Sequence, residues 1–269
     1  MTGAVNKMKT EENVKFCRFW VDGHNYSGRI RGASVDIVEG DPFTRMDDVR
    51  ISFPIERVKF LAPFTPKKIW AVGLNYREHL TEFKDMSFEA PAEPVIFTKT
   101  MNSLCGPSDF IRIPSWAGRI DYEGELAVVI GEGGKNIAVE DALDHVLGYS
   151  IMNDVTARDL QKSDNQWTRA KSFDTFAPFG PVLLLAKEMP ADTGIRTRLN
   201  GKVVQEAVLE QMIFSVAQII SHISRFATLE QGDVIATGTP KGVGAIKPGD
   251  VVEVEIDGIG VLRNVCGIE

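Results

Sequence analysis

Hydrophobic and polar positions alternate in short runs along the first sixty residues of the chain. Two such runs, at residues 14–20 and 28–38, are broken by Asp22-Gly23 and by Gly40-Asp41-Pro42. Alternation of this kind is typical of half-buried strands, and Asp-Gly between two runs is a strong hairpin signal. We therefore predict a small β-rich N-terminal region over residues 1–60, built from a few antiparallel strands.

The pattern changes after residue 60. Residues 61–66 contain two prolines, which resist regular pairing and predict a connector. Beyond it, apolar runs of strand length recur. They lie at residues 69–72, 95–99, 125–130, 148–152, 181–185, 234–237 and 251–256. A second region, residues 61–269, is therefore predicted to be dominated by strands.

Helical spacing is clearest at residues 207–223, where apolar side chains recur every three or four positions. Shorter helices are expected around residues 75–83 and 139–145. Together with the strands, these segments predict an α+β fold that is rich in β-structure.

Composition and charge narrow the possible partners. The chain has 269 residues, of which 43% are apolar and 25% are charged, as in ordinary soluble proteins. Its net charge of -7 argues against a nucleic-acid partner, since phosphate binding requires clustered basic residues. Cys17, Cys105 and Cys266 have neither zinc-site spacing nor the even count of a disulfide framework. With no visible secretory signal and no membrane-length apolar run, we expect a cytoplasmic protein without a membrane partner.

Two closely spaced acids precede one of the apolar runs. Glu123 and Glu125 are two positions apart, so on an extended backbone their carboxylates face the same side. Like charges at that distance repel unless a cation or a proton lies between them. A solvated strand end is the alternative, but the apolar residues that follow make unneutralised acids costly there.

Two further residues can join these acids. Asp154 ends another apolar run, and three carboxylates with open positions suit Mg²⁺ or Mn²⁺ better than zinc. Capping of the next turn is an equally open interpretation for Asp154. Lys171, flanked by Trp167 and Phe173, can hold a substrate carboxylate or oxyanion near the acids, although a lone lysine is more often solvated.

A possible general base lies in the predicted helix at residues 75–83. His79 and Glu82 are three positions apart and share a helical face. A carboxylate beside an imidazole orients the ring and raises its basicity. A surface ion pair is the commoner explanation of such spacing.

Several segments together resemble the fumarylacetoacetate hydrolase family, in the order found in that family. They are AVGLNYREH, PVIFTKT, DYEGELAVVIG, GYSIMNDVTARDLQ, WTRAKSFDTFAPFGP, LNG and GDVIATGTPKGVG. The resemblance covers about residues 60–269. It implies a mixed β-roll with flanking helices, preceded by a small β-rich N-terminal region, and a homodimer.

The resemblance also implies a metal centre. The metal-binding carboxylates of the family fall on Glu123, Glu125 and Asp154, and the lysine close to the metal falls on Lys171. We therefore expect Mg²⁺ or Mn²⁺ as the cofactor.

Further site residues follow from the resemblance. The His–Glu dyad that a lid helix carries in the acylpyruvase and oxaloacetate decarboxylase branch matches His79 and Glu82. Arg158 and Gln161 match polar residues of the substrate pocket. Thr239 matches a loop that contacts the substrate carboxylate.

The implied substrate is a small 2-oxo acid. We expect divalent-metal-dependent hydrolysis of a C–C bond in a 2,4-dioxo acid of the acylpyruvate type, through a metal-bound enolate, because the His79–Glu82 dyad favours a reaction that uses water. Decarboxylation of an oxaloacetate-type acid and isomerisation of a 2-hydroxymuconate-type acid use the same site and stay open. A non-catalytic protein that binds a metal or a carboxylate is the remote alternative.

Overall fold

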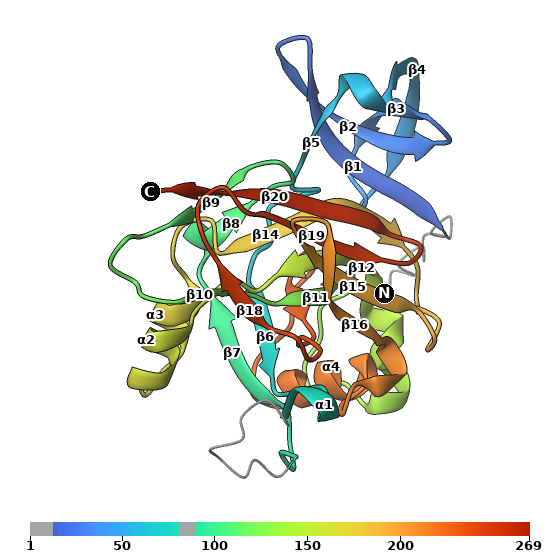
Figure 1. Ribbon diagram of the computed structural model, residues 1–269. Helices are drawn as coiled ribbons and strands as arrows, with labels where there is room; N and C mark the ends of the chain where they lie inside the picture. The colour runs from blue at the N-terminus through green and yellow to red at the C-terminus, as the bar shows by residue number, and fades with distance from the viewer. Residues whose placement is uncertain (1–12, 81–89) are drawn as a thin grey trace.

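The computed structural model describes residues 13–80 and 90–269 (Figure 1). These residues form three β-sheets with short helices on their flanks. A long sheet runs through the molecule, and two smaller sheets accompany it. The predicted β-rich fold with flanking helices is confirmed.

The long sheet has twelve strands among the described residues, ten of which form one hydrogen-bonded path. In spatial order the path is β4 (Met46–Pro54), β3 (Ser34–Gly40), β2 (His24–Arg31), β1 (Val14–Val21), β14 (Ala177–Leu185), β12 (Val146–Asn153), β11 (Gly124–Ile130), β17 (Val234–Ala236), β6 (Ile69–Gly73) and β7 (Val95–Lys99). Beside the path, β5 (Lys59–Leu61) pairs with β1, and β8 (Leu104–Cys105) pairs with β14.

The two smaller sheets contain three and five strands of the described chain. The first orders β13 (Thr156–Ala157), β10 (Ile120–Tyr122) and β18 (Gly244–Ile246), and the second orders β16 (Lys202–Val208), β15 (Gly194–Leu199), β19 (Val251–Ile256), β20 (Gly260–Ile268) and β9 (Phe110–Ile113). The α-helices are α1 (Arg77–Leu80), α2 (Arg158–Ser163), α3 (Thr168–Lys171) and α4 (Val216–Phe226). The 3₁₀-helices are η1 (Ile55–Arg57), η2 (Met101–Ser103), η3 (Val139–His145) and η4 (Leu209–Gln211).

The N-terminal strands project from one end of the molecule as an antiparallel meander (Figure 1). The predicted hairpin at Asp22-Gly23 is present, and both residues have positive φ, 48° and 87°. That geometry is the one that matches the twist of the flanking strands. β1 also pairs with β14, so the meander continues the long sheet. A domain boundary near residue 60 stays a prediction.

The centre of the long sheet is buried on both faces. Along β11, Leu126 and Val128 pack into a core cluster that includes Ile220 of α4, whereas Ala127 and Val129 pack into a second cluster on the opposite face. All four β11 side chains are fully buried. This double burial explains why the sequence of β11 is a continuous apolar run without alternation. It also fixes the side on which Glu125 lies, because side chains two apart share a face.

The predicted helix at residues 207–223 is wrong over its first half. Residues 207 and 208 end β16, which pairs with β15, and η4 follows. The helix starts after Ser215, whose hydroxyl accepts the Gln218 N–H while the Gln218 side chain accepts the Ser215 N–H. This reciprocal capping box sets the start of α4. The apolar spacing before it was therefore a coincidence of strand and turn residues.

The other predicted elements are largely confirmed. The strands predicted at residues 95–99 and 251–256 have the same bounds in β7 and β19. The helix predicted at residues 139–145 is the 3₁₀-helix η3. Of the helix predicted around residues 75–83, the structure describes α1, and residues 81–83 lie outside the described residues. Among the described residues, no helix has the length and hydrophobicity needed to cross a membrane.

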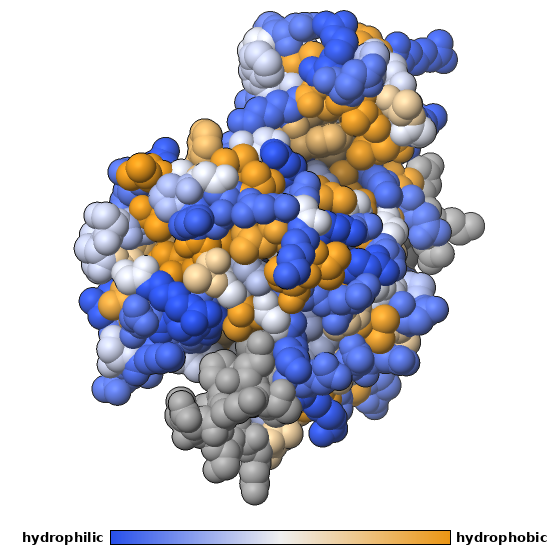
Figure 2. Space-filling model, in the orientation of Figure 1, coloured by the Kyte–Doolittle hydropathy of each residue, from blue (hydrophilic) through white to orange (hydrophobic). Residues whose placement is uncertain are grey.

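One face of the molecule exposes apolar residues. In Figure 2 they gather between charged residues over the five-stranded sheet. The strands β9 and β20 of this sheet carry exposed Phe110, Val261 and Ile268. Grouped apolar side chains are common at contacts with other proteins. The homodimer implied by the sequence stays a prediction.

Candidate metal centre and substrate pocket

Three of the predicted site residues meet where β11 begins and β12 ends. The antiparallel register pairs Gly124 with Asn153, and the Asp154 N–H donates to the Glu123 carbonyl at 2.8 Å. Ligand oxygens of Glu123, Glu125 and Asp154 all lie within 4.8 Å of one another. All three residues are buried. The strand pairing thus brings together carboxylates that are about thirty positions apart in sequence.

The Glu125 carboxylate has a neutral partner. Its Oε2 accepts the backbone N–H of Gly238 at 2.8 Å, and no lysine or arginine of the described chain lies within ion-pair distance of it. Burial, and then the charges of Asp154 and Glu123, raise the pKa of Glu125 well above its usual range. Gly238 has φ of +99°, and a Cβ there would lie 2.7 Å from the Cβ of Asn75. Glycine is therefore required for this backbone to approach the acid.

Lys171 ends the short helix α3 and is almost fully buried. Its ammonium group donates to Glu123 Oε2 at 2.7 Å and to Asp154 Oδ2 at 2.5 Å. Burial alone would lower the pKa of Lys171, but Asp154 and Glu123 outweigh it and the pKa is raised. The Lys171 Nζ also lies 5.0 Å from the centroid of the Phe97 ring. Lys171 is thus a protonated cation between two of the acids.

Lys99 is a site residue that the sequence reasoning missed. It ends β7, is buried, and donates to Asp154 Oδ1 at 2.5 Å and to the Val155 carbonyl at 3.3 Å. Burial lowers the pKa of Lys99, and the nearby Asp154 carboxylate opposes that shift. Each carboxylate oxygen of Asp154 therefore accepts a hydrogen bond from a different lysine. The available signal was a lysine at the end of a strand that begins with three apolar residues.

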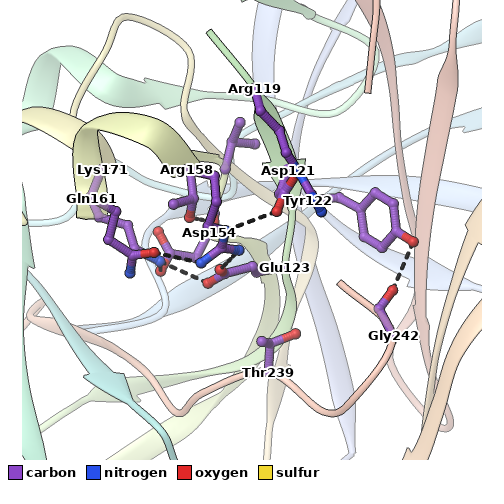
Figure 3. Close-up of polar contacts among 12 residues, drawn as sticks. Arg119, Asp121, Tyr122, Glu123, Asp154, Arg158, Gln161, Lys171, Thr239 and Gly242 are labelled. Atoms are coloured by element: carbon purple, nitrogen blue, oxygen red, sulfur yellow. Dashed lines mark hydrogen bonds and ion pairs between the residues drawn. The ribbon is translucent and has the colours of Figure 1, made fainter. Parts of the chain in front are cut away.

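Arg158 links the acids to a fourth carboxylate, Asp121 (Figure 3). Its Nε donates to Asp121 Oδ2 at 2.8 Å, and its Nη2 donates to Glu123 Oε1 at 2.5 Å. Burial opposes the charged form of Arg158, but Glu123 and Asp121 more than offset it and raise its pKa. Asp121 also accepts Arg119 Nε at 2.6 Å. Arg158 thus contacts Oε1 of Glu123, whereas Lys171 contacts Oε2.

A cavity of about 230 Å³ opens above these groups. We call its buried lining residues the floor and its half-buried or exposed lining residues the mouth. The floor consists of Val72, Glu123, Glu125, Asp154, Arg158, Lys171 and Thr239, and the mouth of Gly73, Leu74, Phe97, Gln161, Lys162 and Trp167. A larger cavity, of about 410 Å³, lies against Leu126 and α4, and none of its described lining residues is a predicted site residue.

Gln161 and Thr239 line the cavity, and their predicted role in binding the substrate stays a prediction. Gln161 Oε1 accepts Arg158 Nη1 at 2.5 Å, so the groups that Gln161 can offer to a ligand are its amide N–H donors. The Thr239 hydroxyl donates to the Gly124 carbonyl at 3.0 Å and accepts Gln205 Nε2 at 2.8 Å. The hydroxyl proton of Thr239 is thus already donated to a backbone carbonyl. Contact between Thr239 and a substrate carboxylate stays a prediction.

The predicted His79–Glu82 dyad is not described by the structure. Glu82 lies outside the described residues, and of His79 only the backbone position within α1 is described. The dyad stays a prediction.

The donor set fits a divalent cation. Glu123, Glu125 and Asp154 offer only oxygen ligands, which Mg²⁺ and Mn²⁺ prefer. Glu125 in particular is a buried acid that lacks a cationic partner among the described residues. A cation beside it would favour the ionised carboxylate, which burial disfavours. The choice between Mg²⁺ and Mn²⁺ stays open because the two ions use the same ligands.

Two known sequence families match the chain. Residues 68–266 match the family described as fumarylacetoacetate (FAA) hydrolase C-terminal. Residues 14–63 match the family described as Rv2993c-like, N-terminal.

Individual proteins match over most of the chain. A protein of Archaeoglobus fulgidus is 54% identical over 211 residues, covering 78% of this chain and 83% of that protein. The mitochondrial oxaloacetate tautomerase fahd2 of Xenopus laevis is 47% identical over 219 residues, covering 77% of this chain and 68% of that protein. Among solved structures, a 2-hydroxyhepta-2,4-diene-1,7-dioate isomerase from Mycobacterium marinum superposes with a TM-score of 0.86 at 40% identity, covering 95% of this chain and 99% of that one.

Proposed function

The chain belongs to the fumarylacetoacetate hydrolase family, and we propose that it is a divalent-metal-dependent enzyme. Its proposed substrate is a small 2-oxo dicarboxylic acid, of which it interconverts either the keto and enol forms or the double-bond isomers. The observation that carries this proposal is the buried group Glu123, Glu125 and Asp154, in which Glu125 lacks a cationic partner among the described residues. The names of the similar tautomerase and isomerase favour proton transfer over bond cleavage.

The buried charges favour an anionic substrate. Asp121, Glu123, Glu125 and Asp154 face Lys99, Lys171 and Arg158, so the formal charge of the centre is -1. A divalent cation held by Glu123, Glu125 and Asp154 would change this to +1 and would supply Lewis acidity toward a 2-oxo group. The substrate carboxylate then enters a region of positive potential.

Lys171 is suited to donate hydrogen bonds during this reaction. Asp154 and Glu123 raise the pKa of Lys171 in the cation-free protein, which favours its protonated form. In our proposal its ammonium group donates to negative charge that develops on the substrate. Gln161 offers amide N–H groups from the neighbouring helix. These donors orient the 2-oxo acid end of the substrate on the floor of the cavity.

A separate group must move the proton at C3 of the substrate. In our proposal this group is His79, oriented by Glu82, because a neutral imidazole has a pKa suited to proton transfer near neutral pH. The assignment rests on the sequence alone.

Hydrolysis of an acylpyruvate-type C–C bond is the second candidate. The predicted His79–Glu82 dyad favours it, since the same imidazole can activate water. Decarboxylation of an oxaloacetate-type acid requires no added nucleophile and stays open as well.

The test follows oxaloacetate tautomerisation through the ultraviolet absorbance of its enol, with and without Mg²⁺ or Mn²⁺, beside product analysis for pyruvate. We expect metal-dependent tautomerisation that His79→Ala slows by about 100-fold, the scale of general acid–base catalysis. Lys135→Ala, at an exposed lysine outside the cavity, is the matched control and should retain wild-type activity.

The outcomes separate the alternatives. Pyruvate formed from oxaloacetate at the rate of enol loss would assign decarboxylation. Cleavage of acetylpyruvate without tautomerisation of oxaloacetate would assign hydrolysis. Activity that survives complete removal of divalent cations would refute the proposed role of the three acids.

A further inference from the structure

The mouth of the cavity contains a lysine for which the reaction chemistry gives no role. We propose that Lys162 binds the distal carboxylate of the substrate and thereby selects dicarboxylic over monocarboxylic 2-oxo acids. This inference rests on the proposed function, since it takes the 2-oxo acid end of the substrate to lie on the floor.

The helix α2 aims Lys162 at the cavity. Gln161 and Lys162 lie three and four positions after Arg158, so each shares a side of the helix with Arg158. All three line the cavity. Since an α-helix rises 1.5 Å per residue, Lys162 starts about 6 Å along the helix axis from Arg158, whose guanidinium contacts Glu123. One helical face therefore runs from the acids to the mouth.

The other cations that line the cavity are already paired with protein carboxylates. Arg158 contacts Asp121 and Glu123, and Lys171 contacts Glu123 and Asp154. Lys162, by contrast, is exposed and makes no hydrogen bond or ion pair with any residue that the structure describes. Among the described lining residues it is thus the cation whose charge is left for a ligand.

Most of the mouth residues other than Lys162 are apolar and offer a carboxylate no counter-charge. Leu74, Phe97 and Trp167 surround the mouth, and the Phe97 and Trp167 rings meet edge to face with centroids 5.3 Å apart. A Cβ on Gly73 would lie 2.7 Å from the Trp167 ring, so the wall is tightly packed there. A charged group that enters an apolar surround is stabilised only by a counter-charge. Apart from the cation Lys162 and the amide of Gln161, the side chains that the described mouth offers to the distal end of a substrate are therefore apolar.

The experiment compares two probes that differ in one charge. Oxaloacetate has a distal carboxylate, whereas its 4-methyl ester keeps the 2-oxo acid end and has a neutral distal group. Dissociation constants of both probes are measured by calorimetry on the Mn²⁺-loaded protein, and initial tautomerisation rates are measured separately. Binding is thus read independently of turnover.

Wild-type protein should bind oxaloacetate about fivefold more tightly than the ester, the scale of a solvent-exposed ion pair of about 1 kcal/mol. Lys162→Ala should remove this preference while leaving the dissociation constant of the ester within about twofold. Lys162→Glu should invert the preference, because like charges repel. Lys162→Arg should preserve it. Lys135→Ala, at an exposed lysine outside the cavity, should behave like wild type.

Other results overturn the inference. It fails if wild type does not distinguish the probes, or if Lys162→Ala weakens both equally, because a general disturbance of the pocket would do the same. Failure of the proposed function gives a different result. The preference for the diacid would then be present and would depend on Lys162, but neither probe would be turned over with Mg²⁺ or Mn²⁺.

Discussion

The floor and the mouth of the cavity differ in how their charged side chains are buried and paired. On the floor, Glu123, Asp154 and Lys171 are buried and joined by hydrogen bonds of 2.5–2.7 Å. At the mouth, Lys162 is exposed and unpaired among the described residues, and Gln161 is half-buried. Buried charges are strongly coupled because the surrounding dielectric is low, whereas exposed charges are screened. The floor is therefore suited to fix a reaction, and the mouth to adjust which substrate undergoes it.

The sharpest test of this contrast is in the unfolding free energy. Lys99 is not itself a floor residue but contacts the floor residue Asp154, so Lys99→Met removes the ammonium group on Asp154 Oδ1 and leaves this buried floor carboxylate with one fewer partner. We expect a loss of about 3–5 kcal/mol, the usual cost of breaking a buried ion pair. Urea unfolding followed by circular dichroism measures it.

Two lysines serve as matched controls for Lys99. Lys59 forms an exposed ion pair with Asp109, so Lys59→Met should cost less than about 1 kcal/mol. Lys162→Met, at the mouth, should change stability by no more than about 0.5 kcal/mol. Equal losses of unfolding free energy in all three variants would contradict this distinction between floor and mouth.

Within the floor, Glu123 and Glu125 are expected to respond differently. Either substitution by Gln should lower kcat by about 100-fold or more, since each removes part of the electrostatic arrangement for the enolate. Glu123→Gln should also destabilise the protein by about 2–3 kcal/mol, because Arg158 and Lys171 lose a charged partner. Glu125→Gln should instead stabilise the cation-free protein by about 1 kcal/mol, because it removes a buried acid without a cationic partner in the described chain.

Thermal unfolding after treatment with a chelator separates these two effects. A fall in Tm for both variants would contradict the distinction between the two acids. A rise in Tm for Glu123→Gln would do so as well.

A smaller effect follows from the raised pKa of Glu125. Below that pKa the acid binds a proton that a divalent cation must displace, so cation affinity should rise with pH by at most about tenfold per unit. In the cation-free protein the quantity that changes with pH is the free energy of unfolding, and it changes in the opposite direction. The native state holds this proton more tightly than the unfolded chain, so stability falls as pH rises from the ordinary range of a glutamate to the raised pKa.

Calorimetric titration with Mn²⁺ in buffers of different ionisation enthalpy measures the proton released. Cation affinity that does not depend on pH below neutrality would argue against a raised pKa for Glu125.

Local patterns predicted the parts of the site that depend on local geometry. The two-residue spacing of Glu123 and Glu125 places them on one side of an extended chain, and an acid after an apolar run marked Asp154. The same patterns predicted the hairpin at Asp22-Gly23, because turn geometry follows from two residues.

The sequence could not predict which residues far apart in the chain contact one another. Lys99 and Asp154 are 55 positions apart, and their contact depends on the end of β7 lying close to the end of β12. Asp121 shares the alternation of Glu123 and Glu125, yet its role depends on Arg158 reaching back from α2. The error at residues 207–223 has the same origin, because pairing with β15 overrides local helical spacing.

The pairing of β1 with β14 determines what the long sheet presents to other molecules at its end. Through residues 183–185, β14 is purely leucine, and β1 covers the backbone hydrogen-bonding groups along that edge. The terminal strand of the path becomes β4, which carries exposed Asp47, Asp48 and Arg50 and ends in proline. Charged side chains and proline discourage strand addition by a second chain. The N-terminal meander thus covers an apolar strand edge and leaves at the end of the path a strand whose charges discourage strand addition.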